Sequence, residues 1–101
     1  MHYVYVLLSL RDSRFYTGYT EDLRKRLEER RQGRVNSTRA RRPLELAYYE
    51  GCVARGDALR REKYLKTTWG KRYLRSRLKS YMGLPPPPAP YNMLDDSRVV
   101  I

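Results

Sequence analysis

The first residues of the chain alternate in a way that predicts a β-strand with two apolar faces. Across residues 3–10, tyrosines and Leu7 fall on one face, while Val4, Val6 and Leu8 fall on the other. Successive side chains of a strand point to opposite faces. The pattern therefore predicts a strand that other parts of the protein cover on both sides.

Two further strands are predicted. The polar residues 11–14 indicate a turn, so that residues 15–20 return antiparallel to the first strand. Gly18 lies in the middle of this second strand, where glycine weakens pairing and often marks the close approach of another backbone. After a basic loop over residues 34–43, residues 44–50 predict a third strand.

A helix is predicted over residues 21–32, with Thr20 as its N-cap and Gly33 as its stop. Leucines and arginines recur on one face of this helix, so the arginines lie beside the side chains that must meet the sheet. That face carries Leu23, Arg26, Leu27 and Arg30. We therefore expect Arg26 and Arg30 to be held near the edge of the core.

Two more helices are predicted after the third strand. The first covers residues 58–68, is capped by Gly56 or Asp57 and is broken at Trp69-Gly70; the second covers residues 71–82. One carboxylate, that of Glu62, falls on the otherwise apolar face of the first helix, which carries Ala58, Leu59, Glu62 and Leu65.

A carboxylate in that position needs a cation, because burying an unpaired charge costs several kcal/mol. The residue pattern leaves two alternatives open. Glu62 forms an ion pair with Arg26 or Arg42, or it binds a hard metal ion. Mg²⁺ keeps most of its waters and accepts one carboxylate when substrate phosphate supplies further oxygen ligands.

The distribution of charge points to a polyanionic partner. The net charge is +11, and 18 of the 22 Lys and Arg residues lie within residues 24–42 and 60–79. Such clustering is typical of nucleic-acid binding, although solvated helix faces are the alternative. A helix lying on a membrane surface is disfavoured, because neither basic helix has a wide apolar face.

The remaining composition narrows the class of protein. One cysteine, Cys52, excludes a disulfide framework, and a single histidine beside it excludes the usual zinc sites. No stretch reaches membrane-spanning length and no signal peptide is evident. We therefore expect no membrane partner and a reducing, cytoplasmic setting.

The composition changes at Gly83. Residues 85–88 are four consecutive prolines, which favour an extended polyproline II segment. We expect one domain over residues 1–82 and a proline-rich tail over residues 83–101 that is extended or flexible. The tail docks on the domain, binds a protein partner, or does neither.

Taken in order, these residues resemble GIY-YIG endonucleases, in the form of the small stand-alone bacterial members. Tyr3-Val4-Tyr5 and Tyr16-Thr17-Gly18 are similar to the paired signature of that family, with one substitution in each triplet. The likeness covers residues 2–82. It continues through Gly18-Tyr19-Thr20, Asp22-Leu23, Arg26-Leu27, Gly33, Thr38, Arg42-Pro43, Tyr48-Tyr49-Glu50 and Ala58-Leu59-Arg60-Arg61-Glu62.

The resemblance implies an α+β fold, with a three-stranded antiparallel sheet flanked by helices, and metal-dependent cleavage of phosphodiesters. It implies that Tyr5 is the general base or its hydrogen-bond partner and that Tyr16 orients water and phosphate. It further implies that Arg26 stabilises the transition state and that Glu62 binds Mg²⁺ or Mn²⁺.

Two positions depart from the family pattern. Arg30 stands where many members carry His or Tyr. An arginine cannot accept a proton, so we expect Arg30 to favour the ionised form of Tyr5 or to grip phosphate. Some members also carry an asparagine after the glutamate, and residues 72–80 contain none.

We therefore expect a metal-dependent endonuclease that acts on nucleic acid, on DNA rather than RNA, with a preference for single strands. The alternatives are a non-catalytic nucleic-acid-binding module that retains the fold, and a basic interaction subunit that works through its proline tail. Contacts to the nucleic acid are expected from Tyr19, Arg34, Ser37, Thr38, Arg39, Arg41, Arg42, Lys66 and Lys71.

Overall fold

A three-stranded antiparallel sheet forms the centre of the structure. The computed structural model describes residues 1–83, and the predicted tail lies outside the described residues except for Gly83. The strands are β1 (His2–Ser9), β2 (Phe15–Thr20) and β3 (Leu44–Cys52), in the order β2-β1-β3. Both pairs are antiparallel. The predicted α+β class, with helices around this sheet, is confirmed.

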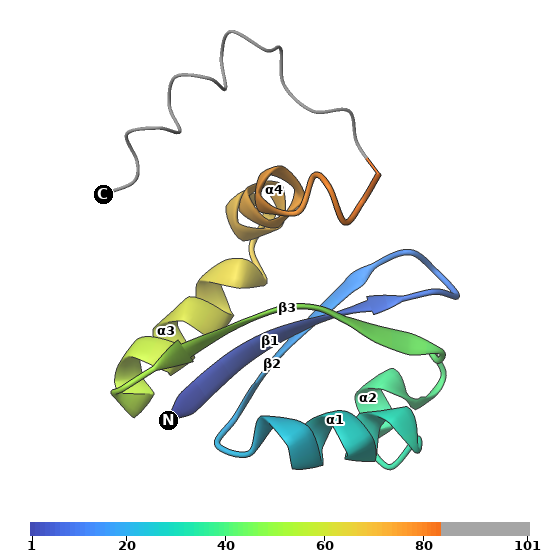
Figure 1. Cartoon of the computed structure of the whole chain (residues 1–101), viewed down its shortest axis with the longest axis horizontal. Coiled ribbons are helices and arrows are strands. Elements are labelled where there is room, and N and C mark those ends of the chain that lie inside the picture. Colours follow the sequence, from blue (N-terminus) through green and yellow to red (C-terminus); the bar gives the residue numbers. More distant parts are fainter. Residues whose placement is uncertain (84–101) are drawn as a thin grey trace, which may run out of the picture.

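Two helical layers cover the sheet from opposite sides (Figure 1). On one side lie α1 (Leu23–Arg31) and α2 (Asn36–Arg39); on the other lie α3 (Arg55–Leu65) and α4 (Thr68–Arg77). None of the helices in residues 1–83 combines the length and apolar character that a membrane crossing requires.

The apolar core lies between the sheet and the second layer. Val4 and Val6 project from β1 into this space and pack with three buried residues of the helices, namely Ala58, Leu65 and Leu74. The opposite face of β1 carries Tyr5 and Leu7, which are also buried. The alternation that predicted a strand with two covered faces is therefore confirmed.

The first helix is shorter than predicted, and a different residue caps it. The side chain of Asp22, not that of Thr20, accepts a hydrogen bond from the backbone N–H of Lys25 at 3.1 Å. Thr20 instead bonds the backbone of Asp22. Gly33 follows the helix with a φ of +79°, a conformation that glycine adopts without strain. Residues 36–39 of the predicted loop form the single turn α2.

The break between the last two helices also differs from the prediction. The chain turns at Lys66 and Thr67, and the Thr67 hydroxyl caps α4 by accepting from the N–H of Gly70 at 3.1 Å. Gly70 is buried because the first turn of α4 lies directly against the end of α3. A Cβ on Gly70 would be 2.5 Å from the Cα of Leu65. This glycine is therefore a packing contact inside a helix, not a helix breaker.

Candidate active site along the edge strand

A groove follows the edge strand β2 between the two helical layers. It comprises three hollows of about 310, 330 and 210 Å³ along β2, of which the second and third share Phe15 and Lys71. We call it the β2 groove. The hairpin, β2 and the segment before α1 line it with residues 13–17 and 19–22. Helix α1 contributes Lys25, Arg26, Glu29 and Arg30. The rest of the lining consists of Ser37, Thr38, Lys66, Lys71, Arg75 and Met82.

Cations from both layers converge on this groove. They come from the hairpin turn, from α1, from the end of α3 and from α4, and they are Arg14, Lys25, Arg26, Arg30, Lys66, Lys71 and Arg75. Among the lining residues, the acids Glu21, Asp22 and Glu29 belong to the first hollow. The linings of the second and third hollows carry basic side chains and no acid, which suits phosphate.

Arg30 is held in the second hollow by the buried Tyr5. Its Nε donates to the Tyr5 hydroxyl at 2.7 Å, and its Nη1 donates to Thr38 Oγ1 at 2.9 Å. Tyr5 is 1% exposed, and its ring lies across the backbone of Gly18. A Cβ on Gly18 would lie 2.5 Å from the Cζ of Tyr5. The glycine thus leaves the space that the phenol occupies; the close neighbour is a side chain, not the backbone that the sequence predicted.

Arg26 lies one turn before Arg30 on the same face of α1 and lines the first hollow. Its Nε is 3.6 Å from Glu29 Oε1, and its side chain is 37% exposed. An ion pair this exposed contributes little stability. The guanidinium of Arg26 is accordingly accessible to a ligand in the groove, whereas that of Arg30 is fixed by two hydrogen bonds.

Tyr16 lines the second hollow, and a carboxylate from the hairpin turn holds its hydroxyl. The Tyr16 hydroxyl donates to Asp12 Oδ2 at 2.6 Å. Because it donates to a carboxylate, the pKa of Tyr16 is raised above its ordinary value, and the same bond holds the pKa of Asp12 below its ordinary value. Tyr16 is therefore a protonated phenol at neutral pH, with an oxygen that can still accept a hydrogen bond.

The rotation of α3 turns Glu62 toward β2. On the β3 side of α3, Arg61 donates to Glu50 at 2.8 Å. Burial pushes the pKa of Glu50 up, but the hydrogen bonds from Arg61 and Tyr48 outweigh burial and leave it lowered. The next residue, Glu62, lies about 100° further around the helix, away from β3.

Two neighbours of Glu62 on the same stripe locate it along the groove. Seven residues before it, Arg55 lies over the ring of Tyr19, 5.9 Å from the centroid. Four residues after it, Lys66 lines the second hollow beside Tyr16. Glu62 therefore projects toward β2 between these two points. Its Oε2 is 3.0 Å from Lys66 Nζ, and its side chain is 21% exposed. The cation beside Glu62 is Lys66, in place of the arginines weighed from the sequence.

The predicted nucleic-acid contacts divide into two groups. Tyr19, Ser37, Thr38, Lys66 and Lys71 line the β2 groove. Four arginines around α2 do not belong to its lining: Arg34, Arg39, Arg41 and Arg42. All four are exposed, and the Arg41 Nε lies 3.8 Å from Oδ2 of Asp12, the carboxylate that holds Tyr16.

The side chains of the site fit a hard cation of a particular kind. Within residues 1–83, no three His, Cys, Asp or Glu side chains are grouped as a cage for a metal ion. A Mg²⁺ or Mn²⁺ ion that keeps most of its waters needs only one carboxylate together with phosphate oxygens. Glu62 has that character, because it is a half-buried carboxylate whose stripe faces a groove suited to phosphate.

Three residues of the site were missed from the sequence. Asp12 looked like an ordinary turn residue, yet its carboxylate holds Tyr16. Arg14 belongs to the predicted polar turn and Arg75 to the predicted helix over residues 71–82, and neither was named as a contact, yet both line the third hollow. One signal was available for Asp12: it comes four residues before Tyr16 across a short hairpin, which brings the turn back beside the strand.

Comparison with known proteins identifies a domain type over nearly all of the described chain. Residues 1–81 match the GIY-YIG catalytic domain. A UPF0213 protein of Bacillus pumilus is 45% identical over 67 residues, which cover 65% of this chain and 67% of that protein. A UPF0213 protein of Staphylococcus aureus is 36% identical over 75 residues, which cover 73% of this chain and 90% of that protein.

A solved structure gives a further similarity. The solution NMR structure of a UPF0213 protein from Bacillus halodurans is 33% identical to this chain. The match covers 75% of this chain and 83% of that one, with a TM-score of 0.49.

Proposed function

Because the chain belongs to the GIY-YIG catalytic-domain family, a nuclease superfamily that acts on nucleic acids, we propose that it is a metal-dependent endonuclease. The substrate would be DNA, and water would hydrolyse its phosphodiester bonds in the β2 groove. One observation carries the proposal: Arg26 from α1 and Tyr16 from β2 line the β2 groove, and Glu62 of α3 pairs with Lys66, which also lines it.

In the proposed reaction, a water oxygen bonds to phosphorus in line with the P–O bond that breaks. The attacking water gives up a proton to solvent, and the departing sugar oxygen takes one up from solvent. Negative charge grows on the phosphoryl oxygens in the transition state. Preorganised cations in a groove stabilise that charge without having to reorganise. Arg26 is the accessible guanidinium for this role, while Lys66 and Lys71 bind the flanking phosphates.

The two tyrosines have different parts in this proposal. The hydroxyl of Tyr5 is buried and accepts from Arg30, so Tyr5 acts as the hydrogen-bond partner that positions Arg30 for phosphate. The hydroxyl of Tyr16 lies in the groove and donates to Asp12. Its free lone pair can accept a hydrogen bond from the attacking water and so orient that water.

Glu62 would hold the Mg²⁺ or Mn²⁺ ion. A hard cation supplies Lewis-acid stabilisation of a phosphoryl oxygen when bound. Lys66 pairs with Glu62 at 3.0 Å, so it holds the carboxylate along the β2 side of α3.

A substitution of Glu62 tests this function. Glu62→Gln keeps the volume of the side chain and removes its charge. We expect it to abolish cleavage of labelled DNA in Mg²⁺ and Mn²⁺, a loss of at least about a hundredfold, while the circular dichroism spectrum and DNA binding stay as in the wild type. The matched control is Asp57→Asn on the same helix, where Asp57 is 61% exposed and pairs with Arg60.

Asp57→Asn should cut at the wild-type rate, and EDTA should stop cleavage by the wild type. Wild-type cutting by Glu62→Gln would show that Glu62 is only the partner of Lys66. The metal-dependent mechanism would then be wrong.

One observation favours a second function, that of a nucleic-acid-binding module without catalysis. The Tyr5 hydroxyl is buried and already accepts a hydrogen bond from Arg30. Arg30 itself stands where many members of the family carry His or Tyr, and an arginine cannot accept a proton. Such a module would bind DNA with strong salt dependence and would cut no substrate in any metal. The same labelled-DNA assay separates the two functions.

A further inference from the structure

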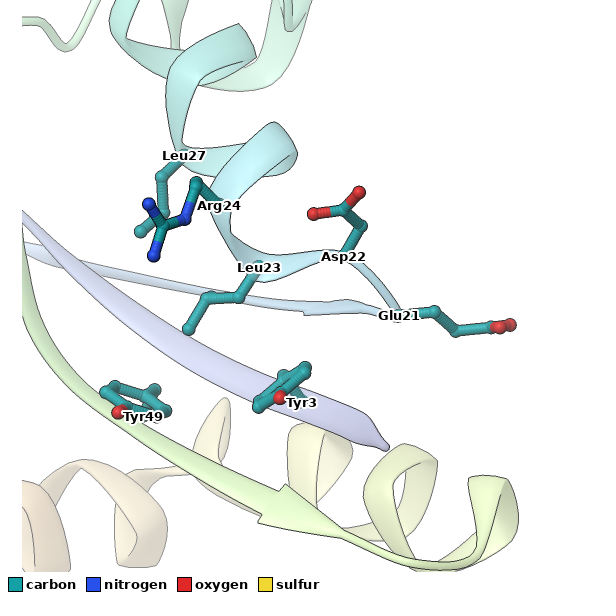
Figure 2. A pocket seen from close by; sticks show the side chains of 7 residues that line it. All are labelled: Tyr3, Glu21, Asp22, Leu23, Arg24, Leu27 and Tyr49. Atoms are coloured by element: carbon teal, nitrogen blue, oxygen red, sulfur yellow. The ribbon is translucent and has the colours of Figure 1, made fainter.

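A fourth hollow lies on the other side of α1, away from the second and third hollows of the β2 groove. Figure 2 shows it between α1 and the end of the sheet formed by β1 and β3. Its volume is about 530 Å³, and its lining residues are Tyr3, Glu21, Asp22, Leu23, Arg24, Leu27 and Tyr49. We call it the Tyr3–Tyr49 hollow. Nothing in the proposed cleavage reaction uses it.

Two tyrosine rings form the floor of this hollow. Tyr3 and Tyr49 come from neighbouring strands, with ring centroids 6.2 Å apart and planes tilted by 59°. Leu23 reaches down from α1 toward the rings (Figure 2). Tyr49 is 53% exposed. A cluster of accessible aromatic rings in a concave surface is typical of a binding site for a flat apolar group.

This hollow joins the β2 groove around the start of α1. Glu21 and Asp22 line both the Tyr3–Tyr49 hollow and the first hollow of the groove. Arg24 faces the Tyr3–Tyr49 hollow, while Lys25 and Arg26 face the groove. A polyanion that leaves the groove at this end therefore meets a cation on each side of the helix.

The acids at this junction leave the aromatic floor open. The side chain of Glu21 points away from the rings in Figure 2. The carboxylate of Asp22 is engaged in capping α1, where it accepts from the N–H of Lys25. The floor thus offers a ring surface with Arg24 beside it. These features suit a nucleobase attached to a phosphate, since the base can stack on tyrosine and the phosphate can pair with arginine.

We propose that the Tyr3–Tyr49 hollow binds an unpaired base of a single-stranded nucleic acid whose backbone occupies the β2 groove. The base stacks on Tyr49 against Tyr3, and Arg24 binds the phosphate next to it. A base inside a duplex cannot enter without unpairing and unstacking. The hollow therefore selects single strands. The inference rests on the proposed function for the position of the backbone and adds to it a subsite that determines strand preference.

Binding measurements in EDTA test this subsite without any cleavage. The probe is a fluorescein-labelled oligodeoxythymidine, and its affinity is measured by anisotropy at fixed salt for the wild type and for Tyr49→Ala. Loss of one stacked base should weaken binding about tenfold. Tyr49→Phe keeps the ring and should bind within about twofold of the wild type. A duplex probe of equal length should bind Tyr49→Ala and the wild type equally.

The matched control is Tyr64→Ala. Tyr64 lies on α3 and is 40% exposed, which is comparable to Tyr49. It lines neither the Tyr3–Tyr49 hollow nor the β2 groove. Its removal should leave single-strand affinity unchanged. Thermal unfolding of each variant verifies that the fold is retained. If Tyr49→Ala does not fold, Arg24→Ala replaces it and should lower single-strand affinity more than duplex affinity.

Equal single-strand affinity of Tyr49→Ala and the wild type would overturn the subsite. So would a wild-type dimer that dissociates in Tyr49→Ala at unchanged affinity, because the occupant would then be a second copy of the chain. Cleavage in Mg²⁺ is scored separately. If the wild type cuts DNA and Tyr49→Ala binds single strands normally, only the subsite is refuted. If the wild type never cuts DNA and Tyr49→Ala loses affinity, only the nuclease proposal is refuted.

Discussion

The hydroxyl of Tyr16 is tied to Asp12, and this single contact determines the form in which Tyr16 enters the groove. The bond raises the pKa of Tyr16, so the protonated phenol persists to higher pH than an ordinary tyrosine. If cleavage needs that phenol, activity should fall only when the pH rises through this raised pKa.

Asp12→Asn tests the contact. The amide retains a hydrogen-bonding group but removes the negative charge, so the pKa of Tyr16 should fall toward its ordinary value of about 10. We expect the alkaline limb of the cleavage profile to move to lower pH, and the shift should be visible when Tyr16 ionisation is followed by ultraviolet difference absorbance. Tyr16→Phe is the control and should lose this limb. Identical profiles for Asp12→Asn and the wild type would reduce Asp12 to a turn residue.

Arg26→Ala should lower the single-turnover rate of cleavage by two or more orders of magnitude, about 3 kcal/mol on the barrier. The reason is that Arg26 is the accessible guanidinium of the first hollow. Arg31→Ala is the matched control, because Arg31 is an exposed arginine of the same helix that pairs with Glu28. A loss of affinity with an unchanged single-turnover rate would make Arg26 a phosphate anchor.

For single residues, the sequence predicted the face of an element on which a side chain lies better than it predicted the hydrogen bonds of that side chain. The helical period placed Arg26 and Arg30 on one face of α1, and both line the groove. The contact of Arg30 with Tyr5 was expected only from the family resemblance, and the bonds from Arg30 to Thr38 and from Tyr16 to Asp12 were not expected at all. Those bonds join residues that only the folded chain brings together.

Among the elements, the strands were the easiest to predict. Their apolar alternation has a period that no other structure shares, and all three were found near their expected bounds. Helix ends were harder. Thr20 and Asp22 both suit an N-cap by residue type, and only the backbone of the turn decides which one accepts the N–H of Lys25.

Gly70 shows why the boundary between α3 and α4 was misjudged. Glycine is a poor helix former, and this property suggested a break. In the structure its missing side chain is what allows α4 to start against the end of α3. The close contact between α3 and α4 outweighs the low helix propensity of Gly70. Residues near Gly70 in the sequence do not reveal that contact.

Gly70→Ala should destabilise the protein by about 1–3 kcal/mol, because the added methyl group overpacks against Tyr64 and Leu65. Urea unfolding measures the difference. Gly56→Ala is the matched control in the first turn of α3, where the nearest neighbour of a new Cβ is the end of Arg60 at 3.7 Å. This control should be neutral or stabilising by up to about 1 kcal/mol. A stabilised Gly70→Ala would contradict the packing role.

Across the whole molecule, the excess of positive charge is concentrated along one edge of the sheet. Cations from the hairpin turn, α1, α3 and α4 meet along one edge of the sheet, although these segments are far apart in the sequence. The clusters at residues 24–42 and 60–79 indicated a polyanion site, but only the folding of the layers shows which members of each cluster face it.

Binding of single-stranded DNA should therefore depend steeply on salt. If about six groove cations each displace a counterion, the slope of log K against log salt should be about −4. Single strands should also compete better than duplex DNA or structured RNA at equal nucleotide concentration. Fluorescence anisotropy over a salt series measures the slope, and competition assays rank the substrates. Stronger competition by duplex DNA would refute the single-strand preference and leave the nuclease proposal standing.

The contact between Tyr5 and Gly18 has a consequence for how such a sequence changes over time. The ring of Tyr5 fills the space beside Gly18 and supports Arg30, so both residues serve the fold whether or not the protein cuts anything. A descendant that lost cleavage would still be selected to keep them. Arg26 lines the groove and Glu62 pairs with Lys66 beside it; neither fills such a space, so decay of the enzyme would first appear at these two positions.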